Sequence, residues 1–259
     1  MTQPDLSAIR KKLEQLQTSN TRSNNLWKPP VGKTQIRLVP YKKSTNGFPF
    51  LELFFHYQIG GKTYLAPTSF GLPDPIEEFS VQLKATGNKE DWNFGRKVEA
   101  KMRTFAPVIV RGEEDQGVKF WGFGKTVYQE LLELMMDPDF GDISDPEKGT
   151  DIMVEYKSAE ELGTSFPKTI IRTKRDRSKL TEDKAQLDKW LNDQTEVTEV
   201  YPLKEYDELK EILDEWMNPS EDEDGEVKVE AKKEVTENDI SSAKKSTVKA
   251  EDFDDLFND

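Results

Sequence analysis

The stretch 96–125 constrains the fold more than any other part of the chain, because two β-prone runs flank a short polar loop. The first run ends in the apolar residues 108–110 and the second reads VKFWGFGK, with Gly112 and Gly117 bounding the loop between them. This arrangement predicts a β-hairpin. Cations and aromatic rings share the stretch, and proteins that hold a single nucleic-acid strand without reading its sequence combine those two kinds of side chain.

Composition excludes several kinds of site. The 259 residues include no cysteine and one histidine, His56. Disulfides, thiolate zinc ligands and cysteine nucleophiles are therefore excluded, and the chain fits a reducing cytoplasm. The N-terminus has no apolar signal segment, and no apolar run approaches the ~20 residues of a membrane span, so we expect neither secretion nor a membrane partner.

The net charge of −13 is unevenly distributed along the chain. Residues 28–129 carry 15 basic and 10 acidic side chains, whereas 130–218 carry 12 and 24, and 219–259 carry 6 and 14. Most of the aromatic residues also lie in the first of these regions. A basic, aromatic front half joined to an acidic rear half suggests nucleic-acid contact combined with an acidic tail.

The N-terminal residues 4–17 have apolar side chains at helical spacing. Arg10, Lys11 and Lys12 lie in the middle of this segment. The pattern predicts a helix, and two readings stay open for its basic face. It is either an ordinary solvated face or an arm that contacts nucleic acid or the next protomer.

The C-terminal segment after 219 is acidic and low in complexity, which predicts disorder. It ends in EDFDDLFND, where apolar side chains recur at i, i+3 and i+4 among carboxylates. Such a peptide is suited to folding onto a basic, apolar groove of a partner, and a plain solubilising tail is the alternative. The residues predicted to dock partners are Phe253, Asp254, Asp255, Leu256 and Phe257.

The middle of the chain predicts a mixed structure with a mainly β core. Strand-like runs lie at 34–40, 50–58 and 151–157, and Gly60-Gly61 joins the second to a return strand at 62–65. Helical patterns lie at 75–86, at 126–136 and, in two pieces broken near Pro202, across 181–218. We read the polar segment around Trp92 and Phe94 as a charged loop.

Candidate nucleic-acid contacts are cations for the phosphates and rings for the bases. A second basic run, FPKTIIRTKRDRSKL at 166–180, lies inside an acidic region, which favours a phosphate-facing role over an ordinary solvated face. The predicted phosphate contacts are Arg37, Lys42, Lys43, Arg96, Lys97, Lys101, Arg103, Lys119, Lys125, Arg172, Lys174 and Arg175. The predicted stacking rings are Tyr64, Trp92, Phe94, Phe105, Trp121 and Phe123. Strand alternation separates Phe120 from Trp121 and Phe123, but it leaves open which set is core.

Catalytic motifs are scarce. A Ser-His-Asp arrangement would require His56, which lies in the middle of a predicted strand. The sequence has no GxxxxGK[ST] phosphate loop, no GxGxxG opening a helix and no HExxH. Carboxylates are plentiful, so composition leaves a metal-dependent nuclease open. An acidic adaptor that binds only proteins is a further alternative.

Several of these motifs together resemble the helix-destabilising single-stranded DNA-binding protein of T-even-type bacteriophages. The matching segments are TQIRLVP, FFHYQIGGKTYL, KMRTFAPVIV, VKFWGFGK and the terminal EDFDDLFND. They cover roughly 27–136 and the last nine residues. The order of a basic arm, an aromatic and basic core and an acidic tail is the most specific element of the resemblance.

The resemblance implies an OB-fold core that binds single strands in a basic cleft. It implies that the arm links neighbouring protomers along the strand, and that Arg10, Lys11 and Lys12 serve this self-association. It also implies that the acidic tail docks phage replication and recombination proteins and competes for the cleft. A tethered polyanion has a high effective concentration near a phosphate site.

The family core usually binds zinc through one His and three Cys. His56 stands where that His would be, but 66–81 supplies no cysteine, and one imidazole with scattered carboxylates makes a poor tetrahedral site. We therefore expect no zinc and no other cofactor. Packing by Phe70, Leu72, Ile76 and Phe79 is expected to replace the metal.

The sequence predicts three regions: an arm at 1–25, a DNA-binding core at 26–218 with a five-stranded OB-like barrel and peripheral helices, and a disordered tail at 219–259. The expected function is cooperative, sequence-independent binding of single-stranded DNA during phage replication, recombination and repair in the bacterial cytoplasm. We expect no enzymatic activity. The residues themselves do not separate DNA from RNA.

Overall fold

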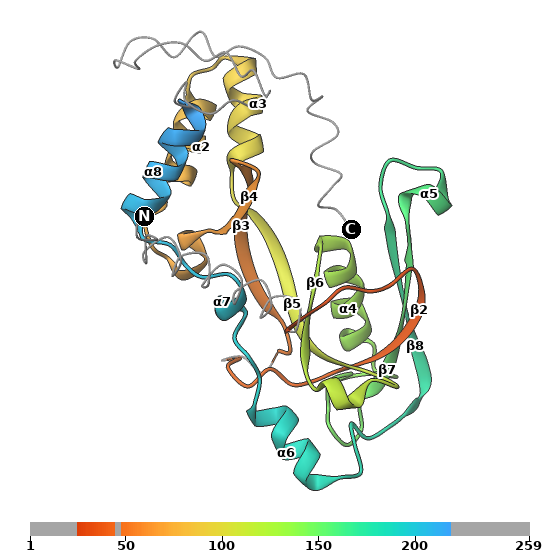
Figure 1. The fold of residues 1–259 in the computed structure, drawn as a ribbon. Coiled ribbons are helices and arrows are strands. Elements are labelled where there is room, and N and C mark those ends of the chain that lie inside the picture. The colour runs from red at the N-terminus through yellow and green to blue at the C-terminus, as the bar shows by residue number, and fades with distance from the viewer. Residues whose placement is uncertain (1–24, 45–47, 219–259) are drawn as a thin grey trace, which may run out of the picture. The chain divides into compact units, whose positions relative to one another are not determined.

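The computed structural model describes residues 25–44 and 48–218, which form two compact units (Figure 1). The described part of unit 1 comprises 25–44, 48–52 and Thr104–Pro202, and that of unit 2 comprises Leu53–Arg103 and 203–218. The region predicted as one core thus contains two units. The predicted arm, with Arg10, Lys11 and Lys12, and the predicted tail, with 253–257, lie outside the described residues.

Unit 1 is built on a sheet with the strand order β1-β6-β5-β2-β7-β8. Neighbouring strands are antiparallel, except that β1 runs parallel to β6. The strands are β1 (Leu26–Trp27), β2 (Gly32–Leu38), β5 (Lys101–Val110), β6 (Lys119–Phe123), β7 (Thr150–Lys157) and β8 (Lys168–Arg177). Pairing among the described strands leaves β1 and β8 at the two ends of this order and does not close the predicted barrel. The expected mixed structure with a mainly β core and several helices is confirmed.

The hairpin predicted within 96–125 is confirmed as the antiparallel pair β5 and β6. Both faces of β6 are buried, with Phe120 on one face and Trp121 and Phe123 on the other. Trp121 packs edge-to-face against Trp27, with ring centroids 5.7 Å apart. Helix α4 (Lys125–Met136) follows β6, as predicted, and buries Leu131 in the same core.

A second core cluster in unit 1 joins the sheet to the segment that follows β8. Leu180 and Trp190 pack there with Val39 and Ile109. Trp190 lies on α6 (Lys184–Asn192), which begins at the capping residue Asp183. The short helix α7 (Val197–Val200) follows, and α5 (Ala159–Leu162) lies in the connection between β7 and β8 (Figure 1).

Unit 2 combines a β-hairpin with helices. Strands β3 (Leu51–Ile59) and β4 (Lys62–Leu65) pair across Gly60 and Gly61, as predicted; both glycines have positive φ, which other residues rarely adopt. The other elements are η1 (Pro67–Phe70), α2 (Pro75–Ala85), α3 (Lys89–Val98) and α8 (Tyr206–Met217). Helix α3 corrects the loop predicted around Trp92 and Phe94, and it begins at Asn88, whose side chain accepts a hydrogen bond from the Glu90 amide.

The helices of unit 2 pack through apolar faces. Ile59, Ile76, Leu83, Val98, Leu209 and Leu213 form its buried cluster. The break predicted near Pro202 is confirmed between α7 and α8, but the first predicted piece is itself divided into α6 and α7 by the non-helical residues 193–196. Within the described ranges, every helix is too short or too polar to cross a lipid bilayer.

Candidate nucleic-acid interface

Strand β8 carries the densest group of exposed cations on the described sheet. Among the described strands it pairs only with β7, so it is an edge strand. Its exposed basic residues are Lys168, Arg172, Lys174, Arg175 and Arg177, and its one carboxylate is Asp176. This strand belongs to the second basic run that the sequence singled out.

The register between β7 and β8 shifts within the basic part of β8, and this bulge-like irregularity is called the bulge from here on. Ile152 pairs with Thr173, whereas Thr150 pairs with Arg177. Lys174, Arg175 and Asp176 therefore stand opposite the single residue Asp151 of β7. Bulges redirect side chains and are common next to functional sites.

Two of the other cations of β8, Arg172 and Arg177, have protein partners that the bulge cations lack. Arg172 lies 3.9 Å from a carboxylate oxygen of Glu155, and Arg177 donates to the backbone carbonyl of Asp139 at 3.2 Å. Within 25–44 and 48–218, Lys174 and Arg175 form no ion pair. Both side chains can therefore accept a phosphate without first losing a protein partner.

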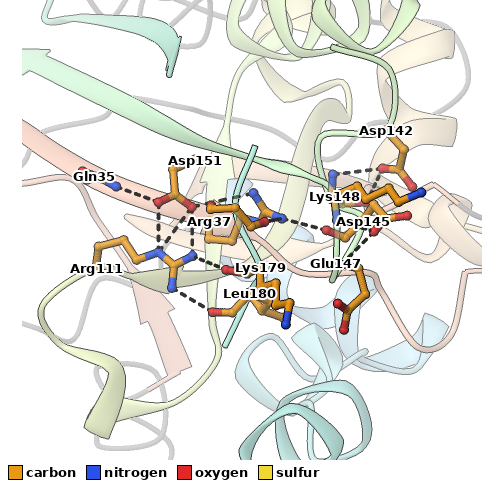
Figure 2. Close-up of polar contacts among 12 residues, drawn as sticks. Gln35, Arg37, Arg111, Asp142, Asp145, Glu147, Lys148, Asp151, Lys179 and Leu180 are labelled. Atoms are coloured by element: carbon orange, nitrogen blue, oxygen red, sulfur yellow. Dashed lines mark hydrogen bonds and ion pairs between the residues drawn. The ribbon is translucent and has the colours of Figure 1, made fainter. Parts of the chain in front are cut away.

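Arg37 corrects one predicted phosphate contact, because its side chain is fully buried. Its Nη2 donates to the backbone carbonyls of Asp145 at 2.7 Å and Ser178 at 2.9 Å, and its Nη1 lies 3.7 Å from Asp151 (Figure 2). Burial lowers the pKa of Arg37 to about 10 against the opposing effect of Asp151. Arg37 is therefore charged at neutral pH but belongs to the interior.

The partly buried Arg111 and the buried Asp151 complete this cluster, and neither was predicted as a functional residue. Arg111 Nη2 donates to Asp151 at 2.9 Å, and the Gln35 amide donates to the same carboxylate at 2.6 Å (Figure 2). Arg111 also donates to the carbonyls of Lys179 at 3.2 Å and Leu180 at 2.8 Å. Arg111 and Asp151 are 40 residues apart, so no local pattern could have joined them.

The rings predicted on β5 and β6 are also corrected. Phe105, Trp121 and Phe123 are buried, with at most 2% of each residue exposed. Trp121 and Phe123 belong to the core cluster of unit 1, and Phe105 packs against the ring of Tyr201, so none of them can stack on a base in this conformation. The strand alternation left two choices open, and both sides of β6 turn out to be core.

The predicted lysines of unit 1 differ in their surroundings. Lys42 donates to the carbonyl of Asn192 at 2.9 Å, and Lys43 forms an ion pair with Glu196, so both fasten the chain near β2 to the segment between α6 and α7. Lys119 donates to Gln116, whereas Lys125 is exposed at the start of α4.

In unit 2, Trp92 is the exposed ring among the predicted stacking residues. It lies on α3 with 43% of its surface exposed, and the guanidinium carbon of Arg96 lies 5.3 Å from its ring centroid. Arg96 is also 4.0 Å from Glu99. A ring and a cation on one helix face offer a base-stacking surface next to a phosphate contact.

The other predicted residues of unit 2 are more enclosed. Phe94 stacks against Trp216 at 5.8 Å, and both Phe94 and Tyr64 are half-buried against the apolar cluster, so these rings are less accessible than Trp92. Lys101 lies 3.0 Å from Glu99, which also pairs with Lys84. Lys97 and Arg103 are half-buried.

Glu99, next to the end of α3, forms ion pairs with more than one lysine. Burial alone would raise the pKa of this carboxyl, but hydrogen bonds from Lys84 and Lys101, with their charges, lower it overall. Glu99 is therefore ionised at neutral pH. It offsets part of the positive charge that the sequence assigned to this region.

His56 is fully buried in unit 2, where the family resemblance would place a zinc ligand. Its Nδ1 lies 2.7 Å from the carbonyl of Val98, and its Nε2 lies 2.9 Å from Asp74. The other oxygen of Asp74 accepts the amides of Ile76 and Glu77 at the start of α2. Both ring nitrogens face oxygen acceptors, so both bonds form when the ring carries two protons.

The packing expected in place of zinc is confirmed in part. Ile76 is fully buried and Phe79 packs against the same cluster, but Phe70 and Leu72 are exposed. The prediction is therefore wrong for Phe70 and Leu72. In the part of the chain that the structure describes, no group of three or more His, Cys, Asp or Glu side chains is placed to hold a metal ion.

No protein-family model matches the chain, and a search of curated proteins finds no match.

Proposed function

We propose that this protein binds single-stranded DNA without sequence preference and without catalysis. The observation that carries the proposal is the exposed cationic strand β8 in a protein whose net charge is −13. Two cations at its bulge form no ion pair with any residue that the structure describes. Each phosphate neutralised by such a strand releases counterions, which favours binding at low salt. A polyanionic ligand accounts for this concentration of positive charge on one edge.

Trp92 and Arg96 favour a single strand as the ligand. An exposed indole can stack on a base only where that base is unpaired, and each stacked base contributes roughly 1–3 kcal/mol. Every base has a π-face, so this contact does not depend on sequence. The proposed ligand is therefore a single strand, for which unit 1 offers the cations of β8 and unit 2, taken by itself, offers a ring on α3.

The resemblance supplies the remaining parts of the proposal. The OB-fold of the core, cooperativity through 10–12 and docking of replication and recombination proteins through 253–257 are proposed on its motifs. The proposed setting is the cytoplasm of an infected bacterium, where the protein would coat strands exposed during phage replication, recombination and repair.

Titration of the intrinsic Trp fluorescence with oligo(dT) at several salt concentrations tests the proposal. We expect quenching and an affinity that falls as salt rises, with a slope of about −0.7 for each phosphate contacted. Absence of binding at low salt would refute the proposal and leave the protein-only adaptor. Incubation of single strands with Mg²⁺ or Mn²⁺ tests the nuclease, which would be revealed by shortened products.

A further inference from the structure

The chain directly after β8 is held by the buried Arg37 of β2 and by the partly buried Arg111, which follows β5. The carbonyl of Ser178 accepts from Arg37, and those of Lys179 and Leu180 accept from Arg111 (Figure 2). Three consecutive carbonyls thus each receive a guanidinium N–H. Hydrogen bonds from charged donors are the stronger kind, so this segment is firmly fixed.

Asp151 connects this anchor to the bulge. It is the one residue of β7 opposite Lys174, Arg175 and Asp176. Its carboxylate accepts from Arg111 and Gln35 and lies 3.7 Å from Arg37 Nη1, so its charge is engaged inside the unit. The carboxylate that β7 places opposite the bulge therefore does not neutralise Lys174 or Arg175.

We infer that Arg37, Arg111 and Asp151 are positioning residues that fix the bulge of β8 and leave its two cations available to phosphate. The inference rests on the proposed function. Arg111 is suited to this role because its Nε, Nη1 and Nη2 all donate to Asp151, Lys179 or Leu180. Side chains that hold a binding group in place gain from being locked by hydrogen bonds of their own.

Salt dependence separates positioning from direct contact. Oligo(dT) binding by the full-length protein is measured for wild type, Arg111→Met, the double variant Lys174→Gln with Arg175→Gln, and the triple variant. Loss of two phosphate contacts reduces the slope of log K against log salt by about 1.4. We expect Arg111→Met alone to reduce the slope by a comparable amount, and the triple variant to show little further reduction.

Two outcomes overturn the inference. If the slope reductions of Arg111→Met and of the double variant add up in the triple variant, Arg111 contacts phosphate itself. If Arg111→Met leaves the slope unchanged, the cluster serves only stability. Val127→Ala, a core substitution on α4, is the control for lost stability, and its slope should equal that of wild type. All slopes are measured where circular dichroism shows the variants folded.

If Arg111→Met does not fold, Gln35→Leu takes its place, because it removes one hydrogen bond to Asp151 and leaves both arginines. We expect a smaller reduction of the slope, and an unchanged slope overturns the inference. Wild-type protein that fails to bind oligo(dT) overturns the proposed function together with the inference. If the wild-type protein binds oligo(dT) but the variants show an unchanged salt slope, only the inference is overturned.

Discussion

Nε2 of His56 lies 2.9 Å from a carboxylate oxygen of Asp74, and both side chains are buried. The second oxygen of Asp74 caps α2, and the second nitrogen of His56 faces the last residue of α3, Val98. One pair of side chains thus connects β3 with the ends of two helices. This contact makes unit 2 sensitive to changes at Asp74.

Asp74→Ala should destabilise the protein by about 2–4 kcal/mol. Loss of the helix cap costs about 1 kcal/mol, and leaving a buried His56 nitrogen without its partner costs about 1–3 kcal/mol. Urea unfolding followed by circular dichroism measures the change. Asn88→Ala is the matched control, because Asn88 caps α3 at an exposed position, and it should cost about 1 kcal/mol. Equal losses in the two variants would argue against the His56–Asp74 contribution.

Acid should remove the contribution of Asp74. Burial would raise the pKa of this carboxyl, but the hydrogen bond and charge of His56 and the amides of Glu77 and Ile76 lower it overall from its ordinary value of 3.8. A lowered pKa stabilises the folded state fully above that ordinary value, and the contribution is lost as pH falls below it. Asp74→Asn retains an oxygen for the cap and does not titrate. The stability difference between wild type and Asp74→Asn should therefore shrink as pH is lowered through this range, and a constant difference would contradict the assignment.

Trp92→Ala should weaken oligo(dT) binding by about 1–3 kcal/mol. The ring is exposed, so the free energy of unfolding should change by no more than about 0.5 kcal/mol. Trp92→Phe should also remove much of the fluorescence quenching on binding, whereas Trp121→Phe should not, because Trp121 is buried in unit 1. Quenching that persists without Trp92 would place the stacking surface elsewhere.

Neutralising the bulge cations should weaken binding and flatten its salt dependence. The double variant Lys174→Gln with Arg175→Gln removes two exposed positive charges, and the slope should fall by about 1.4. Lys184→Gln with Lys189→Gln removes the same charge from exposed positions on α6 of the same unit. If both double variants lose affinity equally, net charge rather than the bulge governs binding.

Local patterns predicted the elements whose signals lie close together in the sequence. The β5–β6 hairpin and the turn at Gly60-Gly61 follow from short runs of strand residues around glycines. Helix α3 was missed although its start carries a usable signal, because Asn88 precedes Glu90 and Asp91 in the first turn. Two aromatic rings in a charged segment led us to predict a loop there.

Long-range contacts explain the errors in the predicted site. Arg37 alternates with apolar residues on β2, and such alternation normally indicates an exposed side chain. Its burial depends on Asp151, 114 positions later, and on carbonyls at 145 and 178. Burial on both faces of β6 likewise depends on how the sheet is covered, which strand periodicity does not encode. The exposed cations of β8 were found because charge density is visible in the sequence itself.

The edge position of β8 also bears on self-association. A strand with a free edge is a template for edge-to-edge pairing, and lysine and arginine side chains prevent this by mutual repulsion between copies. Five like charges on β8 should therefore oppose aggregation through this edge while no polyanion neutralises them.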